Sequence, residues 1–514
     1  MEARRLASAL VADYEAGTGV TGDRPGGLAP SAEPPAEPAG APTTERTAEP
    51  PAGAPGGGPP RPAPGGTPEP PDDGQPWLAA TLPVAALALG SVQAVCRAAA
   101  RAGATGPLVE DPADLGAVAA AFCSDRLLRL DGHPVDGFAE LSGFFRTADG
   151  WVRTHANYPH HRRRLVETLG VPGAAGAAEL AAALGDRRAQ DVEDAATAAG
   201  AVVVRVRTED EWAASAPGRA AASGPLVRSR PREEAGPAVH RTLSLAGGPL
   251  PLAGVRVLDL TRVVAGPVAT RTLALLGADV LRVDPPVPAE IRWQHLDTGQ
   301  GKRTALLDLR DPGDRERAQA LLDEADVLVT GYRPGAVERL GLVAPPGAVH
   351  ARVSAWGETG PWAGRRGFDS IVQAASGIAI VESLGGEARE TARPGALPAQ
   401  ALDHASGYLL AAGVVDALVA RQGDGLGREV SVALARTAAW LLDPTPGAVG
   451  GPRRVHEAGR DPQHPAPAGL PPGAVVSHGH GPRVTTARPA LPGFADYPAP
   501  AHPWGTDHAA WLPR

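Results

Sequence analysis

The clearest hydrophobic pattern in the chain begins near residue 252, where short apolar runs alternate with longer amphipathic ones. The runs VRVLDL, DVLRVD, TALLDL, DVLV and VHARVSA have the length and the valine and leucine content of buried strands. The segments between them, among them ATRTLALLG and DRERAQALLDEA, have helical spacing. Strands that alternate with helices over such distances predict βαβ units and a parallel sheet. Functional loops are then expected at the carboxyl ends of the strands.

Hydrophobic patterns on either side extend this prediction. A helix is expected from about residue 402 to 421, and GREVSVALARTAAWLL has the pattern of a strand that runs into a helix. Upstream, the apolar window 78–100 is interrupted by Pro83 and Gly90, which favours a buried helix over a membrane span. The run AGAVVVRVRTEDEW alternates valine with arginine, as a strand does.

We therefore predict an α/β protein whose parallel-sheet domain is preceded by a smaller α/β domain. Residues 24–75 consist mainly of Pro, Gly, Ala, Glu and Thr. Such a segment cannot bury enough apolar area to offset chain entropy, so we predict that it is disordered. We expect that residues 443–514 either wrap a surface or are disordered. The predicted segments are a short N-terminal segment 1–23, a Pro/Gly-rich linker 24–75, the small domain 76–223, a linker 224–247, the sheet domain 248–442 and a Pro/His-rich tail 443–514.

Composition narrows the possible partners and compartments. The net charge of −8 offers no basic surface for nucleic acid. The two cysteines, Cys96 and Cys123, lack CxxC spacing, so free thiols are favoured over a disulfide or a zinc site. No basic segment followed by an apolar stretch opens the chain. We expect a cytoplasmic protein without a membrane anchor.

Basic residues near the predicted strand ends are candidates for binding an anion. Lys302 is the only lysine among 49 Lys and Arg residues, which suggests a need for a compact charge or a chance survivor on the surface. Arg333 follows the strand DVLV and suits a phosphate or carboxylate, or else an ion pair with Glu338. Arg262 lies in the turn TRVVAGPVATRT, whose amides suit an anion but which lacks GxGxxG.

Asp403 is the candidate nucleophile. It follows PAQAL and opens the apolar segment HASGYLLAAGVVDALVA, so it lies in the first turn of a helix or at its cap. The helix dipole there favours an ionised carboxylate, although a simple N-cap has the same pattern. His155, His160 and His161 have no carboxylate or cysteine at a recognised metal-site spacing, so we predict no metal site.

The motifs GKRTALLDL, YRPGAVERLGL, SAWGETGPW and ALDHASGYLLAAG, in this order after LAGVRVLDLTRVVAGP, resemble family III coenzyme A transferases of the CaiB/BaiF type over residues 252–442. The resemblance implies that Asp403 is the covalent carboxylate, and that Arg262, Lys302 and Arg333 contact the nucleotide and phosphates of coenzyme A. It also implies an acyl-CoA thioester and a carboxylate as small-molecule substrates, no tightly bound cofactor, and a homodimer.

Departures from the family pattern keep two alternatives open. Racemases of the family have a histidine where this chain has Phe368, before Asp369, so one base of a two-base exchange is missing. Val264 replaces a glutamine of formyl-type transferases, and residues 76–223 resemble the family's downstream small domain in degenerate form, yet lie upstream. The usual glycine loop has no clear match after residue 442. A racemase-like isomerase and a non-catalytic acyl-CoA-binding relative are the alternatives to a transferase.

Overall fold

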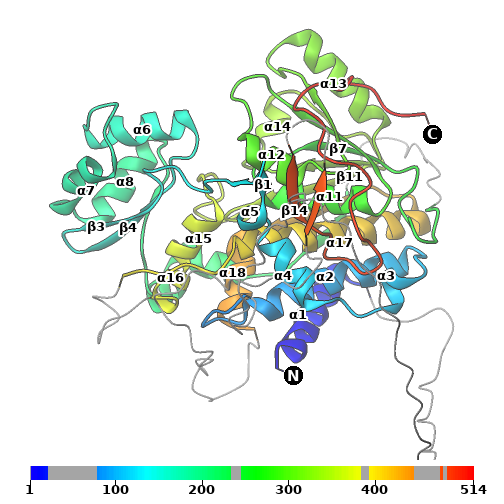
Figure 1. Ribbon diagram of the computed structural model, residues 1–514, viewed down its shortest axis with the longest axis horizontal. Coiled ribbons are helices and arrows are strands. Elements are labelled where there is room, and N and C mark those ends of the chain that lie inside the picture. The colour runs from blue at the N-terminus through cyan, green and yellow to red at the C-terminus, as the bar shows by residue number, and fades with distance from the viewer. Residues whose placement is uncertain are drawn as a thin grey trace, which may run out of the picture.

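A seven-stranded sheet forms the centre of the larger part of the molecule (Figure 1). The computed structural model describes residues 2–20, 78–232, 245–383, 393–444, 475–478 and 483–513. Across the sheet the strands are β6 (Arg228–Pro231), β12 (Arg428–Ala433), β11 (Val349–Ser354), β10 (Val327–Thr330), β7 (Arg256–Leu260), β8 (Asp279–Asp284) and β9 (Arg303–Leu306). All neighbours are parallel except β6, which runs antiparallel to β12. The predicted α/β fold with a largely parallel sheet is confirmed.

The strand order leaves a crevice near the middle of the sheet. From β7 the chain proceeds outward through β8 and β9, and then returns to the other side of β7 for β10, β11 and β12. The loops that leave β7 and β10 therefore diverge, as they do at the switch point of doubly wound sheets. All four residues of β10 are buried, because strands flank it on both sides and side chains cover both faces.

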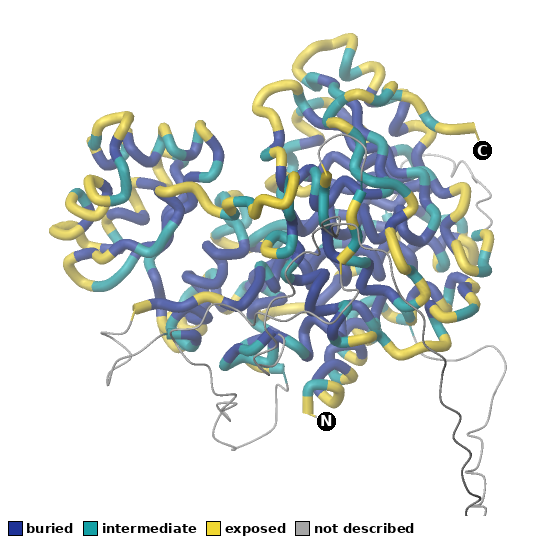
Figure 2. Tube along the Cα trace, viewed as in Figure 1, coloured by how far each residue is buried: buried dark blue, intermediate teal, exposed yellow. Residues whose placement is uncertain are grey.

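Helices pack against both faces of the sheet. Val257 and Val329 face a core that includes α17, whereas Leu258 and Leu328 face a second core that includes α13. The helices of this region are α11 (Ala265–Leu275), α12 (Arg292–Thr298), α13 (Pro312–Glu324), α14 (Ala336–Arg339), α15 (Asp369–Ser376), α16 (Ile378–Val381), α17 (Ala401–Asp424) and α18 (Leu434–Leu442). The helix α17 extends the predicted 402–421 by a few residues and is buried along most of its length (Figure 2).

The upstream part of the chain also packs against α17. Helix α2 lies against α17 on one side and α1 on the other, which is why the apolar window 78–100 forms a buried helix as predicted. The helices of this part are α1 (Glu2–Thr18), α2 (Val84–Arg101), α3 (Pro107–Glu110), α4 (Leu115–Phe122) and α5 (Ser124–Leu127). Only α2 and α17, among the described helices, are long and apolar enough to cross a membrane, and both are mostly buried inside the protein.

A smaller lobe has its own core, on the left in Figure 1. Its antiparallel sheet contains β3 (Phe144–Thr147), β4 (Gly150–Thr154) and β5 (Val203–Arg205), and its helices are α6 (Pro159–Leu169), α7 (Ala177–Gly185) and α8 (Ala189–Ala199). The short helices α9 (Glu209–Ala214) and α10 (Ala216–Ala222) lead back to the large sheet. The predicted domain 76–223 is thus divided, because residues 78–122 belong to the main core.

Parts of the predicted linker and of the predicted tail form regular structure or pack on the large sheet. Residues 228–231, predicted as linker, form the edge strand β6. The tail crosses the surface of the large sheet, where Trp504 Nε1 donates to Asp284 Oδ2 over 3.1 Å and Trp511 Nε1 to the carbonyl of Leu321 over 3.0 Å. A small antiparallel sheet joins β13 (Val475–His478), β14 (Val484–Ala487), β1 (Arg129–Leu130) and β2 (His133–Pro134). The predicted disordered segment 24–75 lies outside the described residues.

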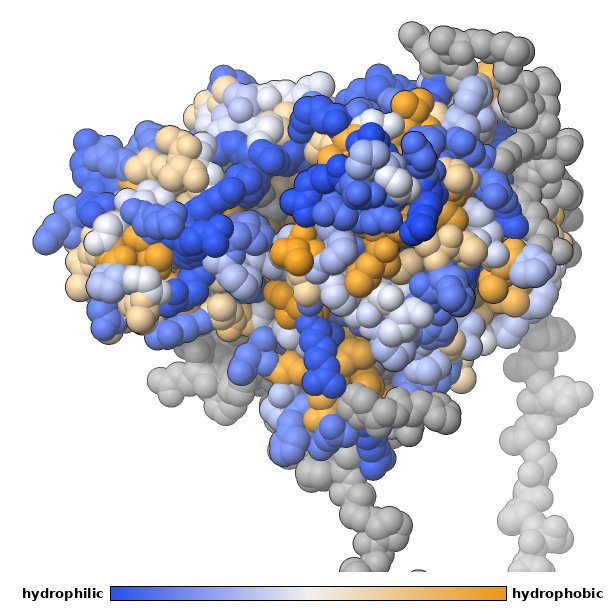
Figure 3. Space-filling model, turned by 90° about the horizontal axis from the view of Figure 1, so that it is seen from above, coloured by the Kyte–Doolittle hydropathy of each residue, from blue (hydrophilic) through white to orange (hydrophobic). Residues whose placement is uncertain are grey.

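Seen from above, hydrophilic side chains cover most of the surface, with small hydrophobic patches between them (Figure 3).

We predict that Tyr14→Phe lowers the free energy of unfolding by about 1–3 kcal/mol, as expected when a buried acceptor loses its donor. The Tyr14 hydroxyl donates to the buried Asp416 carboxylate, which Arg101 also contacts through Nε at 2.7 Å. Urea denaturation measures the change. Replacing the exposed Ser8 by Ala, on the same helix, should change it by less than about 0.5 kcal/mol. Equal values for both variants would contradict the assignment.

Candidate active site

A cavity of about 410 Å³ lies at the carboxyl ends of the central strands. Arg262 and Val263 line it from the loop after β7, and residues 331–334 line it from the loop after β10. The small lobe closes it with Tyr158, His160 and His161. The cavity therefore occupies the crevice that the strand order leaves open, where α/β folds bind their ligands.

Arg262 lines the cavity and holds its two walls together. Its Nη atoms donate to the carbonyls of Pro288 and Ala289 over 3.0 and 2.7 Å. The guanidinium also lies over the ring of Tyr158, 5.4 Å from the ring centroid. Tyr158 in turn donates to Glu290 over 2.7 Å. Most of the hydrogen-bonding capacity of Arg262 is therefore used within the protein.

Glu290 adds a negative charge to the contact between Tyr158 of the small lobe and Arg262 of the sheet domain. Burial alone would raise its pKa, but Arg282 and Arg262 lower the pKa of this carboxyl to about 2. Arg282 Nη2 lies 2.8 Å from Glu290 Oε2. The negative charge of Glu290 is thus held beside Arg262.

Arg333 also lines the cavity, as part of a cluster of unpaired arginines. Burial, then the positive charges of Arg333 and Arg164, lower the pKa of the Arg366 guanidinium. Arg164 and Arg366 both donate to the carbonyl of Gly200, over 3.2 and 3.4 Å. Within the described part of the chain, none of these three arginines has a carboxylate partner within 4.0 Å. Like charges held together without a counterion favour binding of an anion.

Lys302, by contrast, does not line the cavity. Its side chain is buried, and Nζ donates to Asp259 Oδ2 at 3.1 Å, to the carbonyl of Pro267 at 2.9 Å and to Thr270 Oγ1 at 2.6 Å. Burial lowers the pKa of Lys302 to about 8, although Asp259 opposes this shift. All three hydrogens of the ammonium group are engaged inside the protein. The sequence suggested a need for a compact positive charge at Lys302. In this structure internal partners use that charge, and the ammonium group has no hydrogen left for a phosphate.

Asp403 lies in the first turn of α17, as predicted, and is only 6% exposed. Its backbone amide donates to Asp369 Oδ2 over 2.9 Å, and Gln373 donates to the other Asp369 oxygen. Burial raises the pKa of Asp403 well above its usual range, and the charge of Asp369 raises it further. Burial also raises the pKa of Asp369, to about 6. Two buried carboxyls this close titrate as a pair: the first proton is lost more easily than the second, because the second loss would place two negative charges side by side.

The two carboxyls do not line the cavity, but the residue before Asp369 does. Phe368 contributes to the cavity wall, and its ring stacks on that of His155, with the centroids 3.7 Å apart. His161 approaches the same ring edge-on at 5.6 Å. Burial lowers the pKa of His161 to about 3, so this ring is neutral at physiological pH. The rings of Phe368 and His161, and not the carboxyl pair, therefore form the wall of the open cavity here.

Of the four residues predicted from the sequence, the structure brings Arg262 and Arg333 together at the cavity and places Lys302 and Asp403 in the interior. Sequence reasoning missed the contributions of Arg366 and Arg164. Arg366 follows SAWGETGPW, and Arg164 lies in the run of arginines after His161, so only their positions near other motifs gave a signal.

No group of three or more His, Cys, Asp or Glu side chains suited to a metal ion occurs in the described part of the chain. The free thiols Cys96 and Cys123 are half-buried and unpaired, as predicted. Burial raises the pKa of each thiol to about 12, which keeps both protonated at neutral pH.

Comparison with known proteins shows what the sheet domain is similar to. Residues 252–472 match CoA-transferase family III. The sheet domain is similar to that family over this range. Among its relatives, the probable fatty acyl-CoA transferase Rv3272 of Mycobacterium tuberculosis is 34% identical over 37% of this chain and 52% of its own length. The acetyl-CoA:oxalate CoA-transferase of Acetobacter aceti is 32% identical over 36% of this chain and 51% of its own.

Solved structures related to the family III region include that of Rv3272 from M. tuberculosis. It is 35% identical, has a TM-score of 0.34, and is matched over 37% of this chain and 56% of its own. A CAIB/BAIF family protein from Brucella suis is 27% identical, with a TM-score of 0.34, over 38% of this chain and 55% of its own. The chain spans about half the length of the curated relatives it matches.

The buried carboxyl pair predicts a pH-dependent stability. A carboxyl whose pKa is raised by folding stabilises the protein fully below its unfolded pKa of about 4 and loses this contribution as the pH rises through the folded value. For Asp369 that loss is centred at about 6. Asp403→Asn should therefore raise the melting temperature at pH 8, and the gain should shrink toward pH 4. Thermal unfolding over this range tests it, with the exposed Asp186→Asn as control. A gain that grows as the pH falls would contradict this assignment.

Proposed function

We propose that the protein is an acyl-CoA:carboxylate CoA-transferase that works through an aspartyl-CoA thioester on Asp403. The observation that carries this proposal is the state of the Asp403 carboxylate. It is buried at the start of a long helix, receives no hydrogen bond from any described residue, and lies beside Asp369, whose charge raises the pKa of Asp403 further. A carboxylate stripped of solvent and partners is a stronger nucleophile than one in water.

The chemistry proceeds by exchange of acyl partners. The Asp403 carboxylate attacks the acyl-CoA thioester, which releases the thiolate of coenzyme A and forms a mixed anhydride. The thiolate then attacks the aspartyl carbonyl, which gives the aspartyl-CoA thioester and frees the first carboxylate. An acceptor carboxylate repeats the two steps in reverse, leaves as the new thioester and regenerates Asp403. Burial and the charge of Asp369 raise the pKa of Asp403, so Asp403 must lose its proton before the attack.

We further propose that the arginine cluster of the cavity binds the phosphates of coenzyme A. Arg333, Arg366 and Arg164 gather positive charge at the crevice, and the described residues supply no carboxylate to neutralise it. Guanidinium groups bind phosphate oxygens through paired hydrogen bonds. Arg262 lines the same cavity with most of its donors already used, so its role is to shape the wall.

The upstream half contributes to the proposed site. Tyr158, His160 and His161 come from the small lobe, yet they line the cavity formed by the family III region. Arg164, four residues after His160, belongs to the arginine cluster. We infer that the small domain, although displaced in the sequence, is needed for substrate binding. We also propose that the protein forms a homodimer, as the resemblance to the family implies.

A second candidate function is isomerisation at the α-carbon of an acyl-CoA. It is favoured by His161, a neutral ring that lines the cavity and whose Nδ1 has no hydrogen-bond partner in the described part of the structure. A neutral ring nitrogen can accept a proton in place of the base that Phe368 cannot supply, but a pKa of about 3 makes this ring a weak base at neutral pH, so the transferase stays the first candidate. The isomerase predicts α-proton exchange with solvent, and the transferase predicts a covalent adduct.

We predict a covalent coenzyme A adduct on Asp403. Intact-protein mass spectrometry after incubation with a panel of acyl-CoAs should show a species heavier by coenzyme A less one water, which hydroxylamine removes. Asp403→Ala should abolish it, because no other carboxylate takes the role of nucleophile. The exposed Asp186→Ala should keep it. If wild type binds acyl-CoA without forming the adduct, and the substrate's α-proton exchanges with deuterium oxide, the isomerase replaces the transferase. Binding with neither result would indicate a non-catalytic acyl-CoA-binding protein.

We also predict that Arg333→Gln with Arg366→Gln weakens acyl-CoA binding at least about tenfold, as expected for loss of charge-assisted hydrogen bonds. Binding of the corresponding acyl-pantetheine, which lacks the nucleotide and its phosphates, should change little. Isothermal titration calorimetry with both ligands measures the difference. The control is Arg310→Gln, an exposed arginine paired with Asp308 at 2.8 Å. Equal losses for both ligands would place the arginines away from the phosphates.

A further inference from the structure

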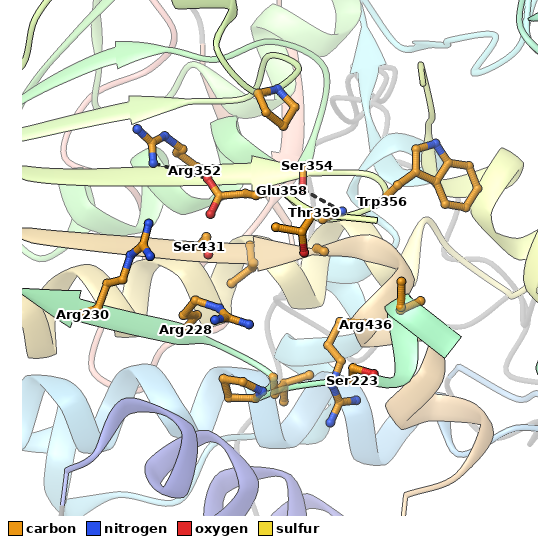
Figure 4. Close-up of a pocket in the computed structure, with 18 of the residues that line it drawn as sticks. Ser223, Arg228, Arg230, Arg352, Ser354, Trp356, Glu358, Thr359, Ser431 and Arg436 are labelled. Carbon is orange, nitrogen blue, oxygen red and sulfur yellow. Dashed lines mark hydrogen bonds and ion pairs between the residues drawn. The ribbon is translucent and has the colours of Figure 1, made fainter. Parts of the chain in front are cut away.

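A second cavity of about 410 Å³ lies at the edge of the central sheet (Figure 4). Residues of β6, β11, β12 and α18 line it, together with the loop 356–359. It shares only Pro334 and Ser354 with the lining of the candidate active site. We refer to it as the edge cavity.

The floor of the edge cavity is an open face of the sheet. Ser431 of β12 is in register with Arg228 of β6 on one side and with Arg352 of β11 on the other. Side chains directly opposite one another on neighbouring strands point to the same face. Burial alternates along β12, and the residues on this face are only half-buried. Two arginines therefore flank a serine hydroxyl on a surface that no described helix fully covers.

Two of the arginines at the edge cavity are neutralised within the protein. Arg230 forms an ion pair with Glu429 through two of its nitrogens. Arg352 lies 3.1 Å from Glu338, 3.3 Å from Glu358 and 3.4 Å from Glu429. These carboxylates fix the two guanidinium groups along the outer part of the cavity.

The other two arginines have no such partner. Arg228 and Arg436 form no ion pair with any described carboxylate, yet both guanidinium groups lie at Gly224. Arg436 Nε donates to the carbonyl of Gly224 over 3.0 Å, and a side chain at Gly224 would meet Arg228 Nη2 at 3.0 Å. Ser431, in register with Arg228, adds a hydroxyl group to the cavity. The arrangement supplies donors from two charged forks and one hydroxyl, and the carboxylates in the lining, Glu338 and Glu358, are paired with Arg352.

Burial makes the charge of Arg436 costly without a counterion. It lowers the pKa of the Arg436 guanidinium, and the carboxylate that opposes this shift, Asp13, already accepts a hydrogen bond from Trp440 Nε1 over 2.9 Å. A partly buried charge is retained in proteins where an anion neutralises it. The two unpaired charges match a ligand that carries two negative charges.

We propose that the edge cavity binds a small oxyanion with two negative charges, held between Arg228 and Arg436 and hydrogen-bonded to the hydroxyl of Ser431. The chemistry is shared by inorganic phosphate, or a phosphate monoester, and by a small dicarboxylate. The site is distinct from the cavity assigned to acyl-CoA, and the proposal stands whether or not Asp403 is the nucleophile.

Isothermal titration calorimetry of the full chain with inorganic phosphate and, separately, with succinate tests the site. The protein used is Arg333→Gln/Arg366→Gln, so that anions bound at the other arginine cluster do not contribute. We expect one of the two ligands to bind with a dissociation constant of roughly 1 mM or tighter. Adding Arg228→Gln and Arg436→Gln should weaken it at least about tenfold.

Matched variants separate a specific site from general charge. Arg228 is exposed, so Arg228→Gln alone should fold and should weaken binding several-fold. The control Arg310→Gln removes an equal charge outside the cavity and should leave affinity unchanged. The ligand that binds more tightly identifies the source as phosphate or dicarboxylate. The proposal is overturned if neither ligand binds, or if Arg310→Gln weakens binding as much as the two cavity substitutions do.

Discussion

The burial of helix α17 is the constraint on which the rest of the structure depends. One side of the helix packs against the sheet and the other against α2, so nearly every position along it is enclosed. A buried helix accepts a charge only where partners are fixed. At Asp416 these partners are Tyr14 and Arg101, both from the upstream segment. At Asp403 burial and the charge of Asp369 both raise the pKa of the carboxyl instead of stabilising its charge. The same helix thus holds one satisfied carboxylate and one unsatisfied carboxylate.

The second constraint is the contact between the two lobes. Arg262 and Glu290 come from loops of the sheet domain, and Tyr158 of the small lobe packs on the first and donates to the second. Because Glu290 is held ionised by two arginines, the hydroxyl of Tyr158 has a strong acceptor. This contact fixes the small lobe over the crevice. The position of the cavity therefore follows jointly from the strand order and from one polar interface.

Much of the fold could be predicted from the sequence, because its signals are local. Each predicted strand from 255 to 355 forms, since a run of valine and leucine bounded by polar residues has little alternative within a parallel sheet. The placement of Lys302 could not be predicted in this way. Its partners Asp259 and Thr270 are more than 30 residues distant in sequence, so nothing local showed that the ammonium group is enclosed. The division of the upstream domain was hidden for the same reason, because α2 is paired with α17 only in three dimensions.

The pattern of paired and unpaired arginines separates structural charges from binding charges. Arginine is abundant in this chain, so its presence alone says little about function. Where a guanidinium supports the fold, a carboxylate lies against it, as Glu193 does against Arg207 at 2.9 Å in the small lobe. Within the described residues, the arginines without such a partner are Arg164, Arg333 and Arg366 at the crevice and Arg228 and Arg436 at the edge cavity. Burial lowers the pKa of two of them, Arg366 and Arg436. Leaving them unpaired costs stability unless a ligand supplies the charge. Unpaired arginines are therefore a better guide to anion sites here than the single lysine, whose charge the protein neutralises internally.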